Sequence, residues 1–166
     1  MNYKTPTTGN KDEQTMYFGN YGTTIGNVKG DTNSTAYIGG KWNTQKCLHA
    51  CTKENKDLTN GVTNNYNTGY CAPACCCVAY STRGTKPGDW YLPMPGELYQ
   101  IYANQTAINE KRKSIKDSGF YGTGYWSSRE NISNREYGVN LHDGYIDIYS
   151  KNNNSRFVLG FLALEV

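Results

Sequence analysis

Six cysteines are the residues of this chain best suited to binding a metal or forming a covalent link. Cys47 and Cys51 lie four apart, on one face of a predicted helix, and the other four follow closely: Cys71, Cys75, Cys76 and Cys77. Four thiolates can hold zinc, but the short C-x2-C pairs typical of zinc knuckles are missing. Buried reduced cysteines acting as small apolar residues are favoured. A disulfide among Cys47, Cys51 and Cys71 and a metal site remain the alternatives.

Few other groups could catalyse a reaction. The two histidines are His49, on a predicted helix, and His142, in a polar C-terminal region. No serine elbow, phosphate loop or paired-acid motif is present. Asp143 and Asp147 lie near a predicted hairpin, where contact with a ligand is their simplest role. The sequence therefore predicts a protein that is not an enzyme and that needs no cofactor.

The charge and the hydropathy of the chain restrict its partners. The net charge of +3, without a basic stripe, argues against nucleic acid. No apolar run is long enough to insert into a membrane. Residues 1–6 lack the charged-then-apolar pattern of a signal peptide. We therefore expect a protein that stays in the cell until release, one displayed on a virion or cell surface, or one whose leader has been removed.

The order of the predicted elements indicates an α+β domain, with helices packed on a small twisted antiparallel sheet. Residues 1–40 are rich in Gly, Thr and Asn and are interpreted as an extended lead-in to a domain over residues 41–166. Asn43 or Thr44 is expected to cap a helix over residues 45–56.

Two further helices are expected in the middle of the chain. The first covers residues 74–80, after Pro73. The second begins near Pro95, whose fixed φ suits a first helical turn, and ends at Gly119. Its apolar residues follow helical spacing except for one gap of six residues, between Tyr102 and Ile108.

The C-terminal part of the chain switches to a period of two, which is typical of strands. The pair Asp143-Gly144 predicts a two-residue hairpin turn. The residues expected to face inward are Val139, Leu141, Ile146 and Ile148. Those expected to face outward after the turn are Tyr145, Asp147 and Tyr149. Residues 157–164 are nearly all apolar and predict a central strand that is covered on both faces.

Several motifs occur in a familiar order: Asp89-Trp90-Tyr91-Leu92-Pro93, then Gly96-Glu97-Leu98, then Tyr125-Trp126-Ser127-Ser128, then Asn-rich strands. In this order the chain resembles the C-type-lectin-fold domains of gut bacteria and their phages. Residues 125–164 resemble, more narrowly, the variable proteins of diversity-generating retroelements. In that family a reverse transcriptase copies a template repeat with errors at adenines. Asn codons of the form AAC can then become any residue except Gln, Glu, Lys, Met and Trp.

The resemblance implies that a region over about residues 129–156 contains fixed and variable positions. Between residues 131 and 155 only Glu136 and Lys151 lie outside the permitted set, and we expect both to be fixed. Ile148 is variable by codon but inward by alternation, and a local bulge or loop would reconcile the two. The positions expected to vary and to bind the ligand are Ile132, Asn134, Arg135, Gly138, His142, Asp143, Tyr145, Asp147, Ile148, Tyr149, Ser150, Asn152, Asn153 and Ser155.

The resemblance implies a receptor or tropism-type protein that binds a protein or glycan on a host or bacterial cell surface. Tyr, Ser, Gly and Asn, which dominate antibody paratopes, also dominate this region. The Glu-Pro-Asn and Trp-Asn-Asp runs of calcium-dependent lectins are missing, so calcium-dependent sugar binding is not expected. The alternatives are a non-diversified adhesin of the same fold and a structural subunit of a phage tail or pilus.

Overall fold

The computed structural model describes residues 16–27, 39–54, 71–114, 120, 124–152 and 156–162, and of residues 51–54 only the backbone. The elements are α1 (Gly40–Glu54), α2 (Ala72–Ala79), β1 (Trp90–Tyr91), α3 (Pro95–Ala103), α4 (Gln105–Ser114), β2 (Gly124–Ile132), β3 (Arg135–Asn140), β4 (Ile146–Ser150) and β5 (Phe161–Leu162). This mixture of helices and small antiparallel sheets confirms the predicted α+β class. None of the helices in the described residues has the length and apolar character needed to cross a membrane.

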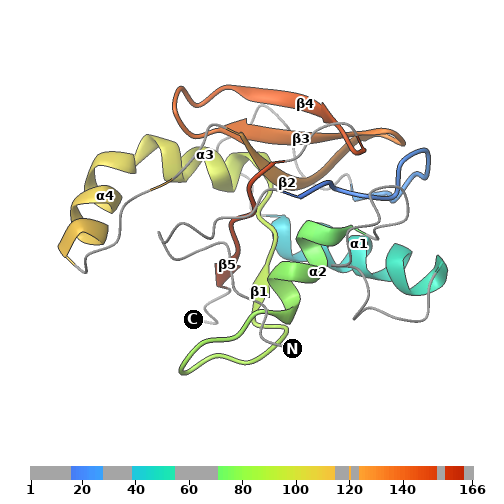
Figure 1. The fold of residues 1–166 in the computed structure, drawn as a ribbon, viewed down its shortest axis with the longest axis horizontal. Coiled ribbons are helices and arrows are strands. Elements are labelled where there is room, and N and C mark those ends of the chain that lie inside the picture. The colour runs from blue at the N-terminus through green and yellow to red at the C-terminus, as the bar shows by residue number, and fades with distance from the viewer. Residues whose placement is uncertain are drawn as a thin grey trace.

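Strands β2, β3 and β4 form an antiparallel sheet in that order, and β1 pairs with β5 in a second, two-stranded sheet. Figure 1 shows the three-stranded sheet at the top of the molecule, with α1 and α2 below it and α3 beside it. The β3–β4 register is regular, with Gly138 opposite Asp147 and Glu136 opposite Tyr149. Strand β2 is irregular, because its register shifts twice between Trp126 and Ile132.

Neighbouring residues of β2 enter two different cores, because successive side chains of a strand point to opposite faces. The Trp126 ring meets Phe18 edge to face, with centroids 5.4 Å apart, in a core shared with α1 and α2. Tyr125 packs on the other side with Leu98 of α3 and Val139 of β3. The sheet is therefore covered on both faces around Tyr125 and Trp126 of β2.

Four of the described cysteines, Cys47, Cys71, Cys75 and Cys77, contribute to the first of these cores. Cys47, Cys71, Cys75, Cys76 and Cys77 are buried thiols. Burial raises the pKa of Cys76 to about 11 and raises that of Cys77 well above its ordinary value. Both thiols are therefore protonated at neutral pH, as expected of small apolar core residues. Within the described residues, no group of three or more Cys, His, Asp and Glu side chains is arranged to hold a metal ion.

Residues 16–27 belong to the folded core. Met16 pairs with Arg156 in an isolated antiparallel bridge, and its carbonyl accepts a 2.6 Å hydrogen bond from the Trp126 indole. Phe18 is fully buried. The lead-in predicted for residues 1–40 is therefore, over this stretch, an integral part of the domain.

Two of the predicted helices differ from those observed. The helix after Pro95 is divided at Asn104, inside the six-residue apolar gap, and α4 begins at the next residue. The Asn104 amide donates to the Gln100 carbonyl at 2.9 Å, competing with the backbone for that acceptor. Helix α1 begins at Gly40, so Asn43 and Thr44 lie inside it and do not cap it. The Thr44 hydroxyl instead bonds the backbone N–H and carbonyl of Leu92.

Two strand predictions are also wrong. Strand β3 ends at Asn140 and β4 begins at Ile146, so the connection is longer than the predicted two-residue turn. The predicted central strand over residues 157–164 is reduced, in the described residues, to the two residues of β5, which pairs only with β1. Phe157 makes a separate bridge with Tyr125. Residues 163 and 164 lie outside the described residues.

Candidate ligand-binding face

The loop between β3 and β4 exposes three of the predicted variable residues. Asn140 organises this loop: its Oδ1 accepts from the His142 N–H at 2.8 Å, and its Nδ2 donates to Asp143 at 3.0 Å. Asp143 in turn accepts from the Tyr145 N–H at 2.9 Å. Leu141 is buried beneath the loop, whereas the side chains of His142, Asp143 and Tyr145 face solvent. Tyr145 is 65% exposed and is therefore available as an aromatic contact.

Strand β4 exposes Ile148 without a bulge. Ile148 pairs with Tyr137 in the regular β3–β4 register and is 37% exposed. The Ile148 N–H donates a hydrogen bond to the Asp147 carboxylate at 2.7 Å. Ile148 lies on the same sheet face as Val139 and Ile146, as alternation predicted, but it is exposed there because the apolar cluster on that face extends to Ile146 and not to Ile148.

Gly138 is buried rather than on an open surface, and Tyr149 is half-buried. Gly138 is buried, and a Cβ there would come within 2.6 Å of the Tyr149 ring and of the Tyr125 carbonyl. The half-buried Tyr149 ring meets Trp126 edge to face at 5.9 Å, with the Arg156 guanidinium 4.0 Å above it. Burial raises the pKa of the Tyr149 hydroxyl, and the negative charge of Asp147 adds to the rise.

The opposite end of the hairpin, around the β2–β3 turn, contains a second group of the predicted positions, two of which are exposed. Ile132 is 52% exposed, and its strand partner Arg135 is exposed as well. Asn134 is half-buried, and its carbonyl accepts from the Lys151 N–H at 3.1 Å. The half-buried Ser150 and Asn152 side chains share a 3.0 Å hydrogen bond. Asn153 and Ser155 lie outside the described residues.

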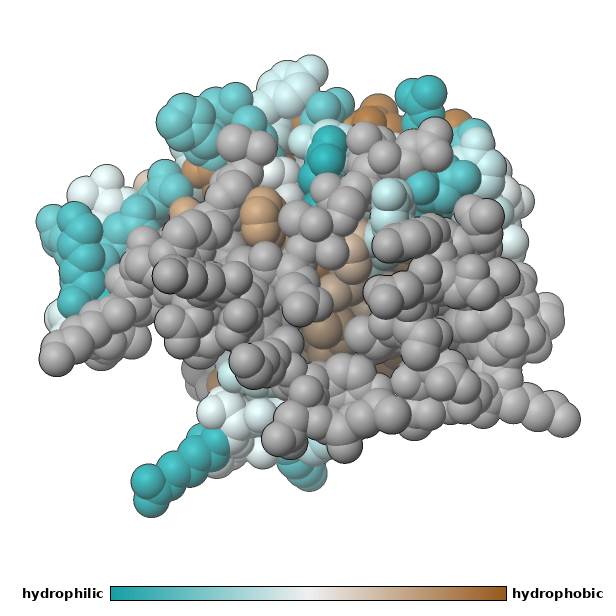
Figure 2. All heavy atoms as spheres, in the orientation of Figure 1, coloured by the Kyte–Doolittle hydropathy of each residue, from teal (hydrophilic) through white to brown (hydrophobic). Residues whose placement is uncertain are grey.

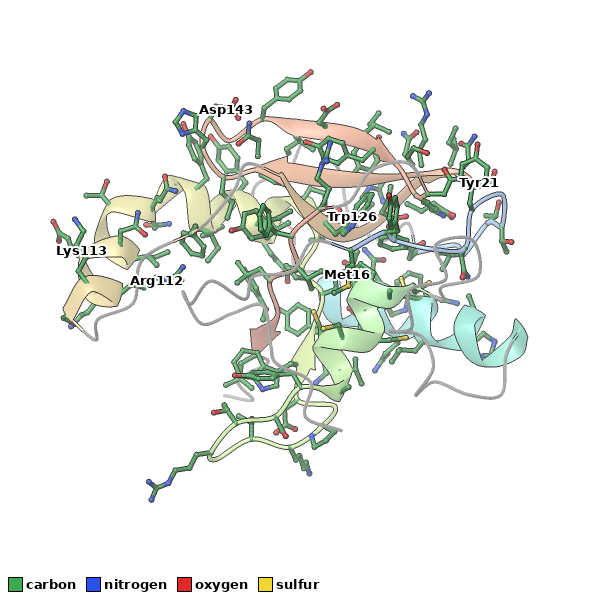
Figure 3. The ribbon with its side chains drawn as sticks, in the orientation of Figure 1. Met16, Tyr21, Arg112, Lys113, Trp126 and Asp143 are labelled. Atoms are coloured by element: carbon green, nitrogen blue, oxygen red, sulfur yellow. The ribbon has the colours of Figure 1, made fainter. Side chains whose placement is uncertain are left out.

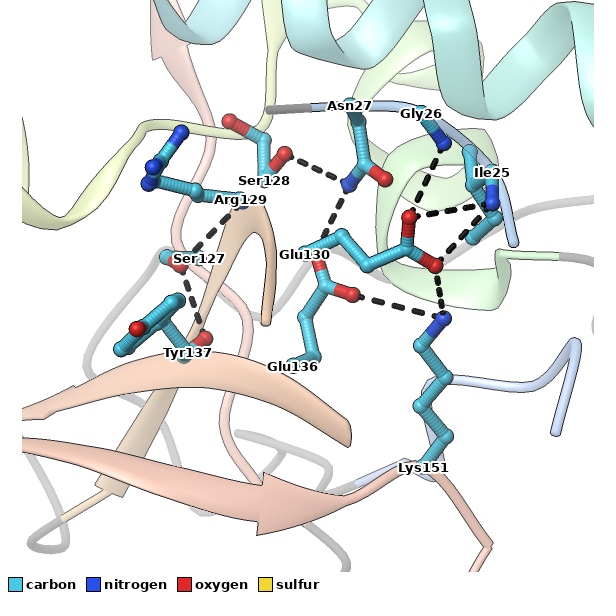
Figure 4. Close-up of polar contacts among 10 residues, drawn as sticks. All are labelled: Ile25, Gly26, Asn27, Ser127, Ser128, Arg129, Glu130, Glu136, Tyr137 and Lys151. Atoms are coloured by element: carbon cyan, nitrogen blue, oxygen red, sulfur yellow. Dashed lines mark hydrogen bonds and ion pairs between the residues drawn. The ribbon is translucent and has the colours of Figure 1, made fainter. Parts of the chain in front are cut away.

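Beneath this end lies a buried ionic cluster of three side chains: Glu130, Glu136 and Lys151 (Figure 4). Lys151 Nζ is 2.8 Å from Glu130 Oε1 and 3.7 Å from Glu136 Oε2, and the three side chains are 0–2% exposed. Glu130 also accepts from the backbone N–H groups of Ile25 and Gly26. The cluster therefore joins β2, β3 and the end of β4 to the N-terminal segment.

Asn27 completes this arrangement and gives Glu136 its second polar contact. Its amide donates to Glu136 Oε1 and to the Ser128 carbonyl, both at 2.7 Å. Burial raises the pKa of Glu136 well above its ordinary value, and the nearby Glu130 carboxylate adds to the rise. Lys151 and the Asn27 amide oppose it. The rise prevails because a single ammonium serves two buried carboxyl groups.

The exposed positions lie at the two ends of the hairpin and at Ile148 on β4. Figure 3 labels Asp143 at one end and Tyr21, which belongs to the N-terminal segment, near the other. The paired part of β4 between them spans about 13 Å, at about 3.3 Å per residue. Figure 2 shows hydrophilic and hydrophobic residues mixed along this upper side of the molecule. Such a mixture suits contact with a ligand through both apolar burial and hydrogen bonds.

Sequence reasoning missed Tyr21, Asn27 and Glu130. Glu130 lies outside the 131–155 range to which the codon rule was applied, so the rule did not single it out. Asn27 carries no local signal, because its role depends on a contact with Glu136, more than a hundred positions away, and the turn that holds Tyr21 is likewise attached through Gly22 to the distant Ser133.

No protein-family model matches this sequence, and no curated protein is significantly similar to it.

Proposed function

We propose that this chain is a ligand-binding protein of the C-type lectin fold, whose C-terminal surface is diversified by adenine-directed retroelement mutagenesis. The support comes from the α+β architecture, from the sequence motifs, and from the way the hairpin divides into buried and exposed positions.

One observation carries the proposal. Glu136 and Lys151 are the two residues of region 131–155 that mutated Asn codons cannot produce, and both are fully buried. They interact with each other and, through Glu130 and Asn27, with the N-terminal segment. Changing either would leave a buried charge or polar group without its partner, which gives a physical reason for both to be constant.

The positions open to variation have the opposite environment. Ile132, Arg135, His142, Tyr145 and Ile148 are exposed, and substitutions at exposed sites usually change stability by less than about 0.5 kcal/mol. A few such side chains can act as anchors within a more polar surround. Gly138 is buried and lies outside this contact set, and the half-buried Tyr149 offers a ligand less surface.

Sequencing the gene and its surroundings in many isolates tests the proposal. We expect a nearby reverse-transcriptase gene and a near-copy of the last coding segment that differs at adenines. Substitutions should concentrate at Ile132, Arg135, His142, Tyr145 and Ile148, with none at Glu136 or Lys151. Evenly distributed changes with no such copy would favour a non-diversified adhesin or a structural subunit of a tail or pilus.

A further inference from the structure

A short turn in the N-terminal segment holds an exposed tyrosine. The Thr23 N–H donates to the Asn20 carbonyl at 3.2 Å, which closes a four-residue turn. Gly22, its third residue, has φ +83°, the backbone of a type II turn, which favours glycine. Tyr21 occupies the second position and is 47% exposed. A fully buried Phe18 and a buried Asn20 precede it.

This turn is attached to the β2–β3 turn. The Gly22 N–H donates to the Ser133 carbonyl at 3.0 Å, and Ser133 follows Ile132 directly. The N–H groups of Phe18 and Gly19 both donate to the Lys151 carbonyl, at 3.1 and 3.2 Å. Tyr21 is therefore held on a fixed backbone beside the end of the candidate face that exposes Ile132 and Arg135. A rigid aromatic loses little conformational entropy when it binds.

We propose that Tyr21 is a constant part of the ligand-binding surface and that the surface takes a protein partner. This inference rests on the proposed function and extends it to a residue outside the variable region. Tyr and Arg are enriched among the residues that dominate protein interfaces, and Ile132 supplies apolar area without a hydrogen-bonding group. The matching partner has an apolar pocket with acidic groups at its edge, complementary to Arg135.

The test uses a library of the full chain displayed on yeast, randomised at Ile132, His142, Tyr145 and Ile148 and selected on serum albumin, an acidic protein. Tyr21→Ala is then introduced into several independent binders. We expect affinity to fall at least about tenfold in most of them, as for an interface hot spot. Tyr21→Phe should stay within about threefold because it keeps the ring. Trp42→Ala changes an exposed aromatic of α1, the helix that lies below the sheet (Figure 1), and should have no effect.

Two results would overturn the inference in different ways. Binders whose affinity does not respond to Tyr21→Ala would exclude Tyr21 and leave the proposed function intact. A library that yields no binders would overturn the proposed function, and the role of Tyr21 with it. Because Tyr21 is exposed, melting temperatures of the Ala variants should match those of their parents; a large fall would show that Tyr21 is structural.

Discussion

Replacing Lys151 with Met, a neutral side chain of similar length, is expected to lower the free energy of unfolding by about 3–5 kcal/mol. Such losses are typical when one partner of a buried ion pair is removed. Lys151 Nζ lies 2.8 Å from Glu130 and 3.7 Å from Glu136, and all three side chains are 0–2% exposed. Water therefore cannot reach the carboxyl groups to solvate them once the ammonium is removed. For a chain of this size, each kcal/mol lowers the melting temperature by about 2–4 °C. The expected fall is therefore about 6–20 °C.

Thermal unfolding followed by circular dichroism at neutral pH measures this fall. Arg135→Met is the matched control, because it removes a positive charge from an exposed side chain of the same hairpin. We expect the control to change stability by less than about 0.5 kcal/mol. A loss below about 1 kcal/mol for Lys151→Met, or an equal loss for the control, would refute the view that this residue is constant because it is structural.

Two further predictions concern the same hairpin. Tyr149→Ala should expose about half of the roughly 200 Å² that a tyrosine can bury and so lower the free energy of unfolding by about 2.5 kcal/mol. Tyr145→Ala should lower it by less than about 0.5 kcal/mol. Equal melting temperatures for the two variants would contradict the assignment of inner and outer positions. Glu136→Gln tests the raised pKa: the folded chain holds the Glu136 proton more tightly than the unfolded chain, so this residue's contribution to stability declines as pH rises from about 4.5 through the folded-state pKa. The wild-type melting temperature, relative to that of Glu136→Gln, should therefore fall as pH is raised, and parallel curves would show that Glu136 does not titrate abnormally.

Local sequence signals predicted the element types better than their ends. Pro95 correctly marked the start of a helix, but the sequence predicted one continuous helix and the observed interruption at Asn104 falls within the apolar gap before Ile108. Asn43 was misread as a cap because capping preferences do not distinguish an exposed helix start from a buried helical position. The Asp143-Gly144 pair was misread as a complete turn, although Asn140 closes a longer loop through its side chain.

On the candidate face, too, some features were predicted correctly from local sequence and others were not. A codon argument singled out Glu136 and Lys151 without any structural information, and both are buried. The orientations of Tyr149 and Ile148 were predicted from alternation under the assumption that one sheet face is buried and the other is open. Both faces are in fact covered near β2, by Trp126 with its core on one side and by Tyr125 with α3 on the other. Exposure is therefore greatest at the ends of the hairpin and at Ile148.

The sequence by itself determined the α+β class, the period of the strands and the polar, tyrosine-rich character of the C-terminal region, because these depend on residues close together along the chain. Only the tertiary structure decided which side chains reach solvent and what neutralises the buried carboxyl groups. Those outcomes depend on contacts such as that of Ile25 with Glu130, which join segments more than a hundred residues apart. A strand's alternation specifies that two faces exist, but the elements packed against each face determine which of its residues can meet a ligand.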